Sequence, residues 1–408
     1  MSKYRHNHYV PIWYQERFML PDQHKYYRLD LHPEVRTSGK VKYTRNDVHH
    51  WSPERIFAED DLYTTRWGNI SNVEIEQFFF GRLDNEAAGA VDFFAGFDHS
   101  DINHEAFNKL MTYMSVQKLR TPKGLAYLAA LTKSNNTNLT LLSLQTMQNM
   151  YCAIWTESVW QIADATDSPT KFIISDHPVT VYNRACPPLS KWCLRVNDPD
   201  IRMHATHTYF PLFLNKVLIL TNLSWVRNPY QPELKARPNP NFFHNTIFNF
   251  LSVQAGRKLT EDEVLQINYI TKRRAYRYIA AAEREWLYPE KRVSTDYWKK
   301  LGGGYLLMPE PRLIVMGGEV MVRYEGGQVE AFSEYGHKPW QRGYKDEERD
   351  KRDSEALYRF QAEWAMMHGP KHTAYNHDFG GDGPREDSED MMDHHKAVLK
   401  RHRAAKHD

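Results

Sequence analysis

Hydrophobic residues recur at helical spacing in three long segments of the first half of the chain. The first begins near residue 71, where Ser71 and Glu74 have the spacing of a capping box. The second covers about 104–131, with Pro122 as a kink or a restart, and the third covers about 139–165. We therefore predict a set of amphipathic helices that pack against one another.

The pattern changes at residue 171. The run FIISDHPVTVY (172–182) predicts a strand, a tight turn and a second strand, and residues 208–223 contain another apolar strand with a turn at 215–216. A second capping box, Thr260 to Glu263, opens a basic helix that we expect to run to about residue 286. Glycine pairs at 317–318 and 326–327 predict a three-stranded meander over 313–333, followed by a helix over about 346–368 that ends at Gly369.

These elements predict the α+β class. A helix-rich N-terminal half packs with a mixed or antiparallel sheet, and a small C-terminal β-meander and helix are added to it. We divide the chain into a main domain (1–287), an appended meander and helix (288–369) and a polar tail (370–408). The tail is polar and mixed in charge, so we expect it to be disordered.

Composition narrows the class of protein. The 408 residues are 41% hydrophobic, which is enough for a folded core, and no apolar run reaches the ~18 residues of a membrane span. Cys152, Cys186 and Cys193 form no disulfide framework, so we expect a cytoplasmic protein. The net charge of +2 argues neither for nor against nucleic acid.

Polar side chains on apolar faces are the first candidates for chemistry. On an extended segment His6 and His8 share one face, so they are either metal ligands or buried histidines with ordinary hydrogen bonds.

Glu76 lies within the apolar stripe of the first helix, made of Phe79, Phe80, Leu83, Ala87, Ala90 and Phe94. The inward face of the second helix becomes polar at Gln117 and Thr121, with Arg120 beside them. Because buried charges need partners, Glu76 is a candidate partner for Arg120.

Two later segments add further candidates. Ser175 and Asp176 follow a buried strand, where Asp176 either binds a ligand or accepts hydrogen bonds from nearby backbone amides. Asn268 lies near the apolar side of the basic helix and is expected to join the buried polar set. The basic residues of that helix either contact nucleic-acid phosphates or form a solvated face: Lys272, Arg273, Arg274 and Arg277.

Taken together, these motifs resemble the domain-of-unknown-function family numbered 4238. The matching elements over about 6–285 are HYVP (8–11), a helical acidic pattern at Glu76 and 84–86, QxxRTP (117–122), SDxPV (175–179), FPL (210–212) and Asn268. His177 stands where the family usually has asparagine. The resemblance implies a mixed helical and β fold, mostly bacterial, without an established activity.

Two functions therefore stay open. One is a phosphoester hydrolase or nuclease, in which His8, Glu76 and Asp176 are catalytic, with a divalent metal as candidate cofactor and His8 and Asp176 as candidate ligands. Its binding residues would be Gln117, Arg120, Thr121, Ser175 and Asn268. The other is a non-catalytic binding or interaction protein in which the same residues form a structural network.

Overall fold

The computed structural model describes residues 6–38, 41–44, 46–63, 65–67, 70–72, 80–133, 137–193, 196–231, 234–236, 248–303, 307–314, 319–323, 326–333, 336–376 and 381–406. Its centre is a five-stranded sheet in which β9 and β14 are parallel and the other neighbours are antiparallel. The order is β11 (Thr180–Asn183), β12 (Thr206–Phe213), β13 (Lys216–Thr221), β9 (Val159–Asp164) and β14 (Gln254–Lys258).

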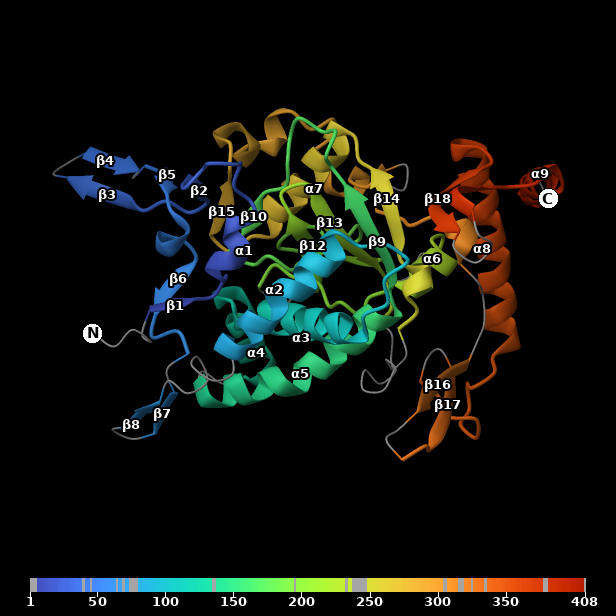
Figure 1. Cartoon of the computed structure of the whole chain (residues 1–408), viewed down its shortest axis with the longest axis horizontal. Coiled ribbons are helices and arrows are strands. Elements are labelled where there is room, and N and C mark those ends of the chain that lie inside the picture. Colours follow the sequence, from blue (N-terminus) through green and yellow to red (C-terminus); the bar gives the residue numbers. More distant parts are fainter. Residues whose placement is uncertain are drawn as a thin grey trace.

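Helices cover both faces of this central sheet. Strands β9, β12 and β13 read as nearly continuous apolar runs and are buried along almost their whole length, as expected for a sheet enclosed on two sides. In Figure 1 four helices lie below the sheet and α7 (Glu261–Arg274) lies above it. The four are α2 (Gly81–Ala95), α3 (His104–Arg120), α4 (Pro122–Thr132) and α5 (Thr137–Glu157). Trp160 of β9 contacts Phe94 of α2 and Phe107 of α3 in the core between them.

A second, antiparallel sheet lies beside the first and contains the N-terminal strands. Its order is β10 (Ile174–Ser175), β15 (Tyr278–Ala281), β2 (Tyr26–Asp30) and β5 (Val48–Trp51). Strands β10 and β11 are close in sequence but belong to different sheets, so the segment SDHP is the corner at which the chain passes from one sheet to the other. That corner positions most of the residues discussed below.

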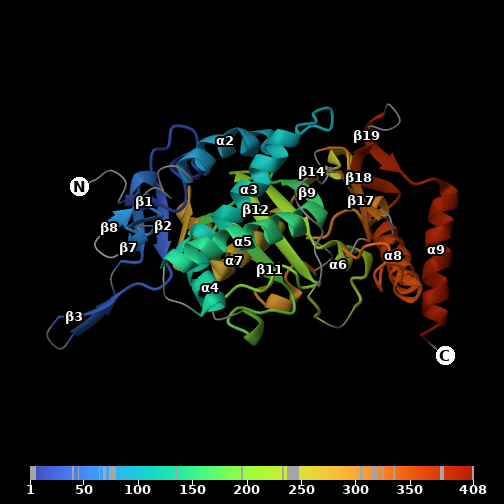
Figure 2. The same cartoon turned by 90° about the horizontal axis from the view of Figure 1, so that it is seen from below.

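Smaller elements lie at the two ends of the molecule. The N-terminal end holds β1 (His6–His8), α1 (Ile12–Glu16), β6 (Ala58–Asp60) and the hairpins β3 (Val35–Ser38) with β4 (Val41–Thr44) and β7 (Thr65–Trp67) with β8 (Ile70–Asn72). The opposite end holds α8 (Glu347–His368) and α9 (Glu389–Ala404) (Figure 2). Helix α8 packs through Phe360 and Trp364 against Trp225 of α6 (Leu223–Arg227).

Several predictions are confirmed. The fold is α+β, with a helix-rich half against sheets. Residues 208–223 lie in the β12–β13 hairpin and the loop that follows it. The capping box at α7 is present, since Thr260 accepts from the backbone of Glu263 and the Glu263 side chain accepts in return. Helix α8 ends before Gly369, whose φ of 74° is a left-handed conformation that glycine adopts without strain.

The predicted start of the first helix is wrong at Ser71. That residue lies in β8 opposite Arg66 of β7, and the described part of α2 begins ten residues later at Gly81. Glu74, the other half of the expected capping box, lies outside the described residues. Capping spacing is a local signal that strand pairing overrides here.

Two predicted helices are too long. Helix α5 ends at Glu157 and the run VWQIAD becomes β9, because its β-branched and aromatic residues fit the centre of the buried sheet. Helix α7 ends at Arg274 rather than near 286, and residues 278–281 form β15. Asp176 accepts hydrogen bonds from the backbone amides of residues 276, 277 and 278, which removes the donors that a continued helix would need.

The C-terminal segments also differ from expectation. Two strands of the predicted meander are described, β16 (Glu319–Arg323) and β17 (Val329–Ser333). The expected first strand begins at Leu313, the last residue of a 3-10 turn, and its continuation from residue 315 lies outside the described residues. The tail is not disordered throughout, since β18 (Lys371–Asn376), β19 (Gly381–Glu386) and α9 form within it. Ser388 caps α9, acidic residues lie in its first turn and basic residues in its last, so a local signal outweighs the polar composition. The three-part domain division stays a prediction.

Candidate functional site

His8 lies at the edge of the N-terminal layer and bonds to backbone. Strand β1 pairs with β6, and His8 Nε2 lies 3.1 Å from the carbonyl oxygen of Glu54. The described residues contain no group of three or more His, Cys, Asp or Glu side chains able to hold a metal ion, so His8 and Asp176 have no third ligand among them. His6, in the same strand, pairs opposite Asp60. Glu76, the other predicted catalytic residue of this half, lies outside the described residues.

Arg120 forms a buried ion pair with Asp84, whereas its predicted partner, Glu76, lies outside the described residues. Its two terminal nitrogens donate to the carboxylate of Asp84 at 3.1 and 2.7 Å, so the pair is bidentate. Gln117 Oε1 accepts from Arg120 Nε at 2.8 Å, and Gln117 Nε2 donates to the carbonyl of Tyr9. The network ties α2 and α3 to the N-terminal segment. It leaves Arg120 only 1% exposed.

Asp176 is held by backbone amides at the corner between the two sheets. Its Oδ1 accepts from Tyr276 N at 2.9 Å, and its Oδ2 accepts from Arg277 N at 2.6 Å and Tyr278 N at 2.8 Å. The amide donors therefore come from a segment 100 residues away, not from the turn that follows Asp176. Burial raises the pKa of Asp176 to about 6, although these amide bonds and Lys123 oppose the rise.

Ser175 and Asn268 hold the same region together. Ser175 Oγ accepts from the backbone of His177 at 3.1 Å. Asn268, on α7, accepts from Ile173 N at 3.1 Å and donates to the carbonyl of Lys171 at 2.8 Å, which joins α7 to the segment that leads into β10. Both side chains are buried, as predicted.

The basic residues of α7 do not gather into one exposed patch. Lys272 pairs with Glu290, and Arg277 pairs with Asp30 beyond the end of the helix. Arg274 is 1% exposed and donates to the carbonyls of Cys186 and Asn197. Arg273 is the one exposed member of the four.

The side chains that converge most closely form a cluster of four charged or titratable groups: Lys118, Lys123, His177 and Asp198. Lys118 Nζ donates to Asp198 Oδ2 at 2.5 Å and to the carbonyl of Val179 at 3.1 Å, and lies 2.9 Å from His177 Nε2. Lys123 Nζ donates to Asp198 Oδ1 at 2.8 Å and to the carbonyl of Arg274 at 2.6 Å. We call these four residues the lysine cluster.

Thr121 completes the lysine cluster and fixes its geometry. Its Oγ1 lies 2.6 Å from His177 Nδ1 and accepts from the backbone of Gly124 at 3.1 Å, so the same hydroxyl caps α4 and contacts the imidazole. Thr121 also separates α3 from α4, which places Lys118 and Lys123 on either side of the break. Of the predicted binding residues, Thr121 contacts a side chain of this cluster, and Ser175 contacts the backbone of His177.

Burial shifts the pKa values in the lysine cluster. It lowers the pKa of Lys118 to about 8, with Asp198 opposing the shift, and it lowers the pKa of His177 to about 3, helped by Lys118. Burial alone would raise the pKa of Asp198, but the two ammonium groups hold it well below its ordinary value. At pH 7 the imidazole is therefore neutral, and one carboxylate faces two ammonium groups.

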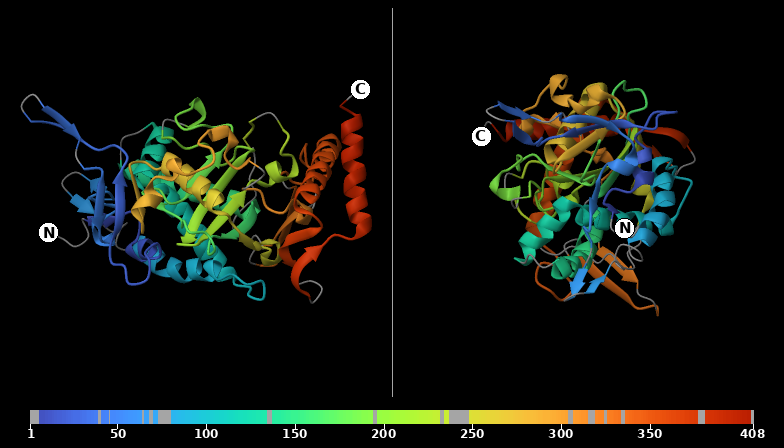
Figure 3. Two further views of the ribbon diagram at one scale, coloured as in Figure 1. Left: turned by 90° about the horizontal axis from the view of Figure 1, so that it is seen from above. Right: turned by 90° about the vertical axis from the view of Figure 1, so that its left-hand side faces the viewer.

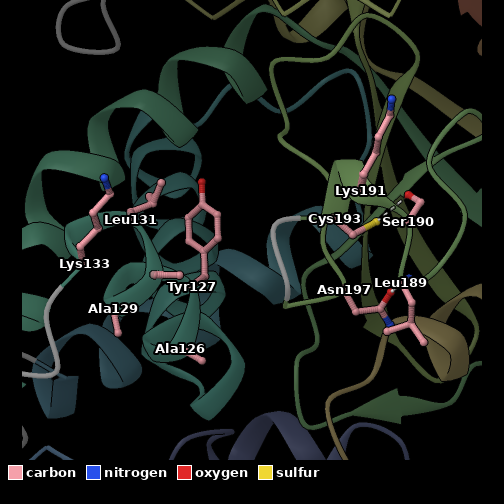
Figure 4. Close-up of a pocket in the computed structure, with 11 residues that line it drawn as sticks. Ala126, Tyr127, Ala129, Leu131, Lys133, Leu189, Ser190, Lys191, Cys193 and Asn197 are labelled. Atoms are coloured by element: carbon pink, nitrogen blue, oxygen red, sulfur yellow. Dashed lines mark hydrogen bonds between the residues drawn. The ribbon is translucent and has the colours of Figure 1, made fainter.

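A cleft opens beside the lysine cluster. It has a volume of about 1170 Å³ and lies between α4 and the loop that carries Leu189, Lys191 and Asn197, as Figure 4 shows. Its charged lining residues, Lys133 and Lys191, are both cationic, and α4 contributes an apolar wall of alanines and Leu131. A smaller cavity of about 10 Å³, roughly room for one water molecule, adjoins the cluster and is lined by Lys118, Lys123, His177 and Asp198. Tyr127 lines both the cleft and this cavity.

The sequence analysis missed the lysine cluster. The polar turn at 117–121 was recognised, and Lys118 lies within it, three residues before Thr121 on the helical face. His177 was noted only as a departure from the family pattern. Asp198 lies in an irregular segment without a periodic signal, and its proximity follows from the tertiary fold alone.

Gly124 is the backbone position on which the cluster depends most directly. A Cβ built there would lie 2.4 Å from the carbonyl oxygen of Lys118 and 2.5 Å from that of Leu119, so the backbone would have to move. We expect Gly124→Ala to lower the free energy of unfolding by about 2 kcal/mol, an overpacking effect.

Gly89, within α2, is the matched control for this substitution. A Cβ there meets nothing within 4 Å. Gly89→Ala should raise stability by about 0.5–1 kcal/mol through helix propensity alone. Chemical denaturation of both variants checks the pair, and equal effects at the two glycines would contradict the close approach at Gly124.

Comparison with known proteins identifies the family of this chain. A family model described as "Protein of unknown function (DUF4238)" matches residues 6–285. The chain belongs to this family. The match confirms the resemblance drawn from the motifs, and it ends after β15, before α8. No curated protein and no solved structure matches the chain. Among the described residues no helix is long and apolar enough to cross a membrane.

Proposed function

We propose that this DUF4238 protein binds a phosphate-bearing ligand in the cleft that α4 lines together with residues 189–193 and Asn197, and that it hydrolyses the phosphoester bond of this ligand. The observation that carries the proposal is the position of Lys118. Its ammonium group lies between a neutral imidazole and a carboxylate, beside a water-sized cavity that shares Tyr127 with the cationic cleft. A strongly shifted titratable group next to a cleft is a feature of catalytic sites.

The charges around the cleft support an anionic ligand. Lys133 and Lys191 line the open part, and its described lining residues include no carboxylate. Lys118 and Lys123 lie at the inner end with one carboxylate between them. Tyr127 and the apolar wall of α4 suit the organic part of an ester, such as a base or an aromatic ring.

The proposed role of Lys118 is that of a general acid. A water molecule attacks phosphorus and releases its proton to solvent as the bond from phosphorus to the leaving oxygen breaks. Below pH 8 Lys118 is an ammonium, and it gives a proton to that leaving oxygen through the one water for which the cavity has room. Asp198 and His177 hold its position, and Lys123 adds positive charge next to the same carboxylate. Asp176, one of the predicted catalytic residues, then has a positioning role, since it orders the corner that carries His177.

Turnover by the full-length protein tests the proposal. The substrates are bis(p-nitrophenyl) phosphate, p-nitrophenyl phosphate, nucleotides, single-stranded DNA and RNA, each with and without divalent cations. We expect Lys118→Met to reduce kcat/KM at least about 100-fold, whereas Lys109→Met, on the surface of the same helix α3, leaves it unchanged. Melting temperatures of both variants separate lost chemistry from lost folding. Absence of turnover with every ester, or equal turnover by the Lys118→Met protein, would overturn the proposal.

A non-catalytic binding protein is the second candidate, and one observation favours it. His8, Arg120 and Asp176 each have protein partners at hydrogen-bonding distance, and the latter two are buried. In that case the polar groups stabilise the junction of the sheets. Substitutions in the lysine cluster would then lower the melting temperature without any catalytic effect.

A further inference from the structure

A second pocket lies at the boundary between the family-matched region and α8. It has a volume of about 210 Å³ and is lined from four parts of the chain: the 202–204 segment before β12, α6 with its N-cap Asn222, the residues Gln231, Lys235 and Ala236, and the first turns of α8. Figure 3 shows the C-terminal helices at this end of the molecule, well separated from the N-terminal layer. Helix α8 reaches the main body here through its packing on α6.

Cationic side chains predominate around this pocket. Arg202, Lys235, Arg349 and Arg352 line it, and among the described lining residues Asp353 is the one carboxylate. Asp353 Oδ1 already accepts a hydrogen bond from Asn228 Nδ2, and it lies 3.6 Å from Arg352 Nε. Arg202 bonds to Asp200 through Nε and Nη2, which leaves Nη1 without a hydrogen bond among the described residues.

His204 supplies an independent indication of a ligand. The residue is 6% exposed, it lines the pocket, and its Nε2 has no hydrogen-bond partner in the part of the chain that the structure describes. A buried polar atom without a partner is costly, so native structures rarely leave one unless a ligand or water completes it. His204 is fixed in place by its backbone, since its N–H donates to the carbonyl of Lys235 at 2.9 Å and Met203 bridges to Ala236.

The first two turns of α8 bring two cations to the pocket. Asp346 caps the helix, and Arg349 and Arg352 project from these turns. Arginine binds phosphate oxygens in pairs. The arginines and the unpartnered Nε2 of His204 therefore favour the same class of ligand.

We propose that this pocket is an anion site for a phosphate group, distinct from the cleft beside the lysine cluster. Arg352 and Arg349 bind the phosphate oxygens from α8, Arg202 binds through Nη1, and His204 Nε2 completes the set. Because α8 lies outside the family-matched residues, a bound phosphate joins the appended helix to the main body. Occupancy of the pocket therefore strengthens the attachment of α8.

Calorimetric titration of the full-length protein with inorganic phosphate, at constant ionic strength, tests the site. We expect saturable binding that Arg352→Gln weakens about tenfold, in line with the loss of one charged hydrogen-bond donor. Arg352 is 66% exposed, so this variant should fold normally. His204→Gln should weaken binding too, provided its melting temperature stays close to that of the wild type.

The cleft provides the control that separates this site from the proposed active site. Lys191→Gln, on the cleft, weakens only phosphate bound in the cleft, so the binding that depends on Arg352 should stay unchanged. Binding that is lost with Lys191→Gln and kept with Arg352→Gln would overturn the proposal, as would the absence of saturable binding. Neither result alters the turnover experiment, so the two proposals can fail separately.

Discussion

Asp198→Asn is expected to lower the free energy of unfolding by about 4 kcal/mol, because it leaves two buried cations without a counter-charge. The carboxylate of Asp198 accepts from both Lys118 and Lys123, and all three side chains are less than 10% exposed. An asparagine of the same shape keeps the packing but adds an amide donor where two ammonium donors already converge. Denaturant titration followed by circular dichroism measures the loss.

Two further variants identify the cause of that loss. Asp167→Asn removes a carboxylate that is 72% exposed beside Lys258, so it should change stability by less than about 1 kcal/mol. Adding Lys118→Met to Asp198→Asn should recover part of the loss, since one unpaired cation is removed. If Asp198→Asn is as stable as Asp167→Asn, the ion pairs of the cluster do not stabilise the fold as described.

Asp176→Asn should cost about 3 kcal/mol, for a different reason. The carboxylate accepts three backbone N–H groups, two of them on Oδ2. An asparagine has one acceptor oxygen, so its NH2 group must face at least one of these donors. The strand β15 would lose the anchor that fixes its start beside β10.

The same variant distinguishes a structural role from a catalytic one. Asp101→Asn, at an exposed residue in the turn before α3, is the control and should leave stability unchanged. A large drop in melting temperature confined to Asp176→Asn is the expected result. An Asp176→Asn protein of native stability that has lost turnover would contradict this account and would restore Asp176 as a catalytic residue.

Where the conformation depends on neighbouring residues in the chain, the sequence predicted the secondary structure correctly. The capping box at Thr260, the β12–β13 hairpin and the glycine end of α8 depend on short-range chemistry. The same reasoning failed where distant residues decide the conformation. Residues 276–278 continue a helical pattern, yet Asp176 takes their amides and a strand follows.

In the candidate site too, the sequence predicted local features and missed contacts between distant residues. Helical spacing correctly placed Gln117, Arg120 and Thr121 on a buried face, and the strand-end position singled out Asp176. Helical spacing could not reveal which carboxylate pairs with Arg120. In the described structure this carboxylate belongs to Asp84. Helical spacing also could not identify Asp198 as a site residue. This carboxylate lies in an irregular segment, and only the tertiary fold brings Lys118 and Lys123 into contact with it.

The measurement that tests the central claim most directly is the pH dependence of phosphoester turnover by the full-length protein. If Lys118 is the general acid, kcat/KM should fall as pH rises through about 8, because the lowered pKa of Lys118 sets the loss of its proton there. The Lys118→Met protein should lack this inflection and most of the activity. Turnover that is independent of pH between 7 and 9 (roughly a unit on either side of that pKa), or that keeps the inflection without Lys118, would contradict the account.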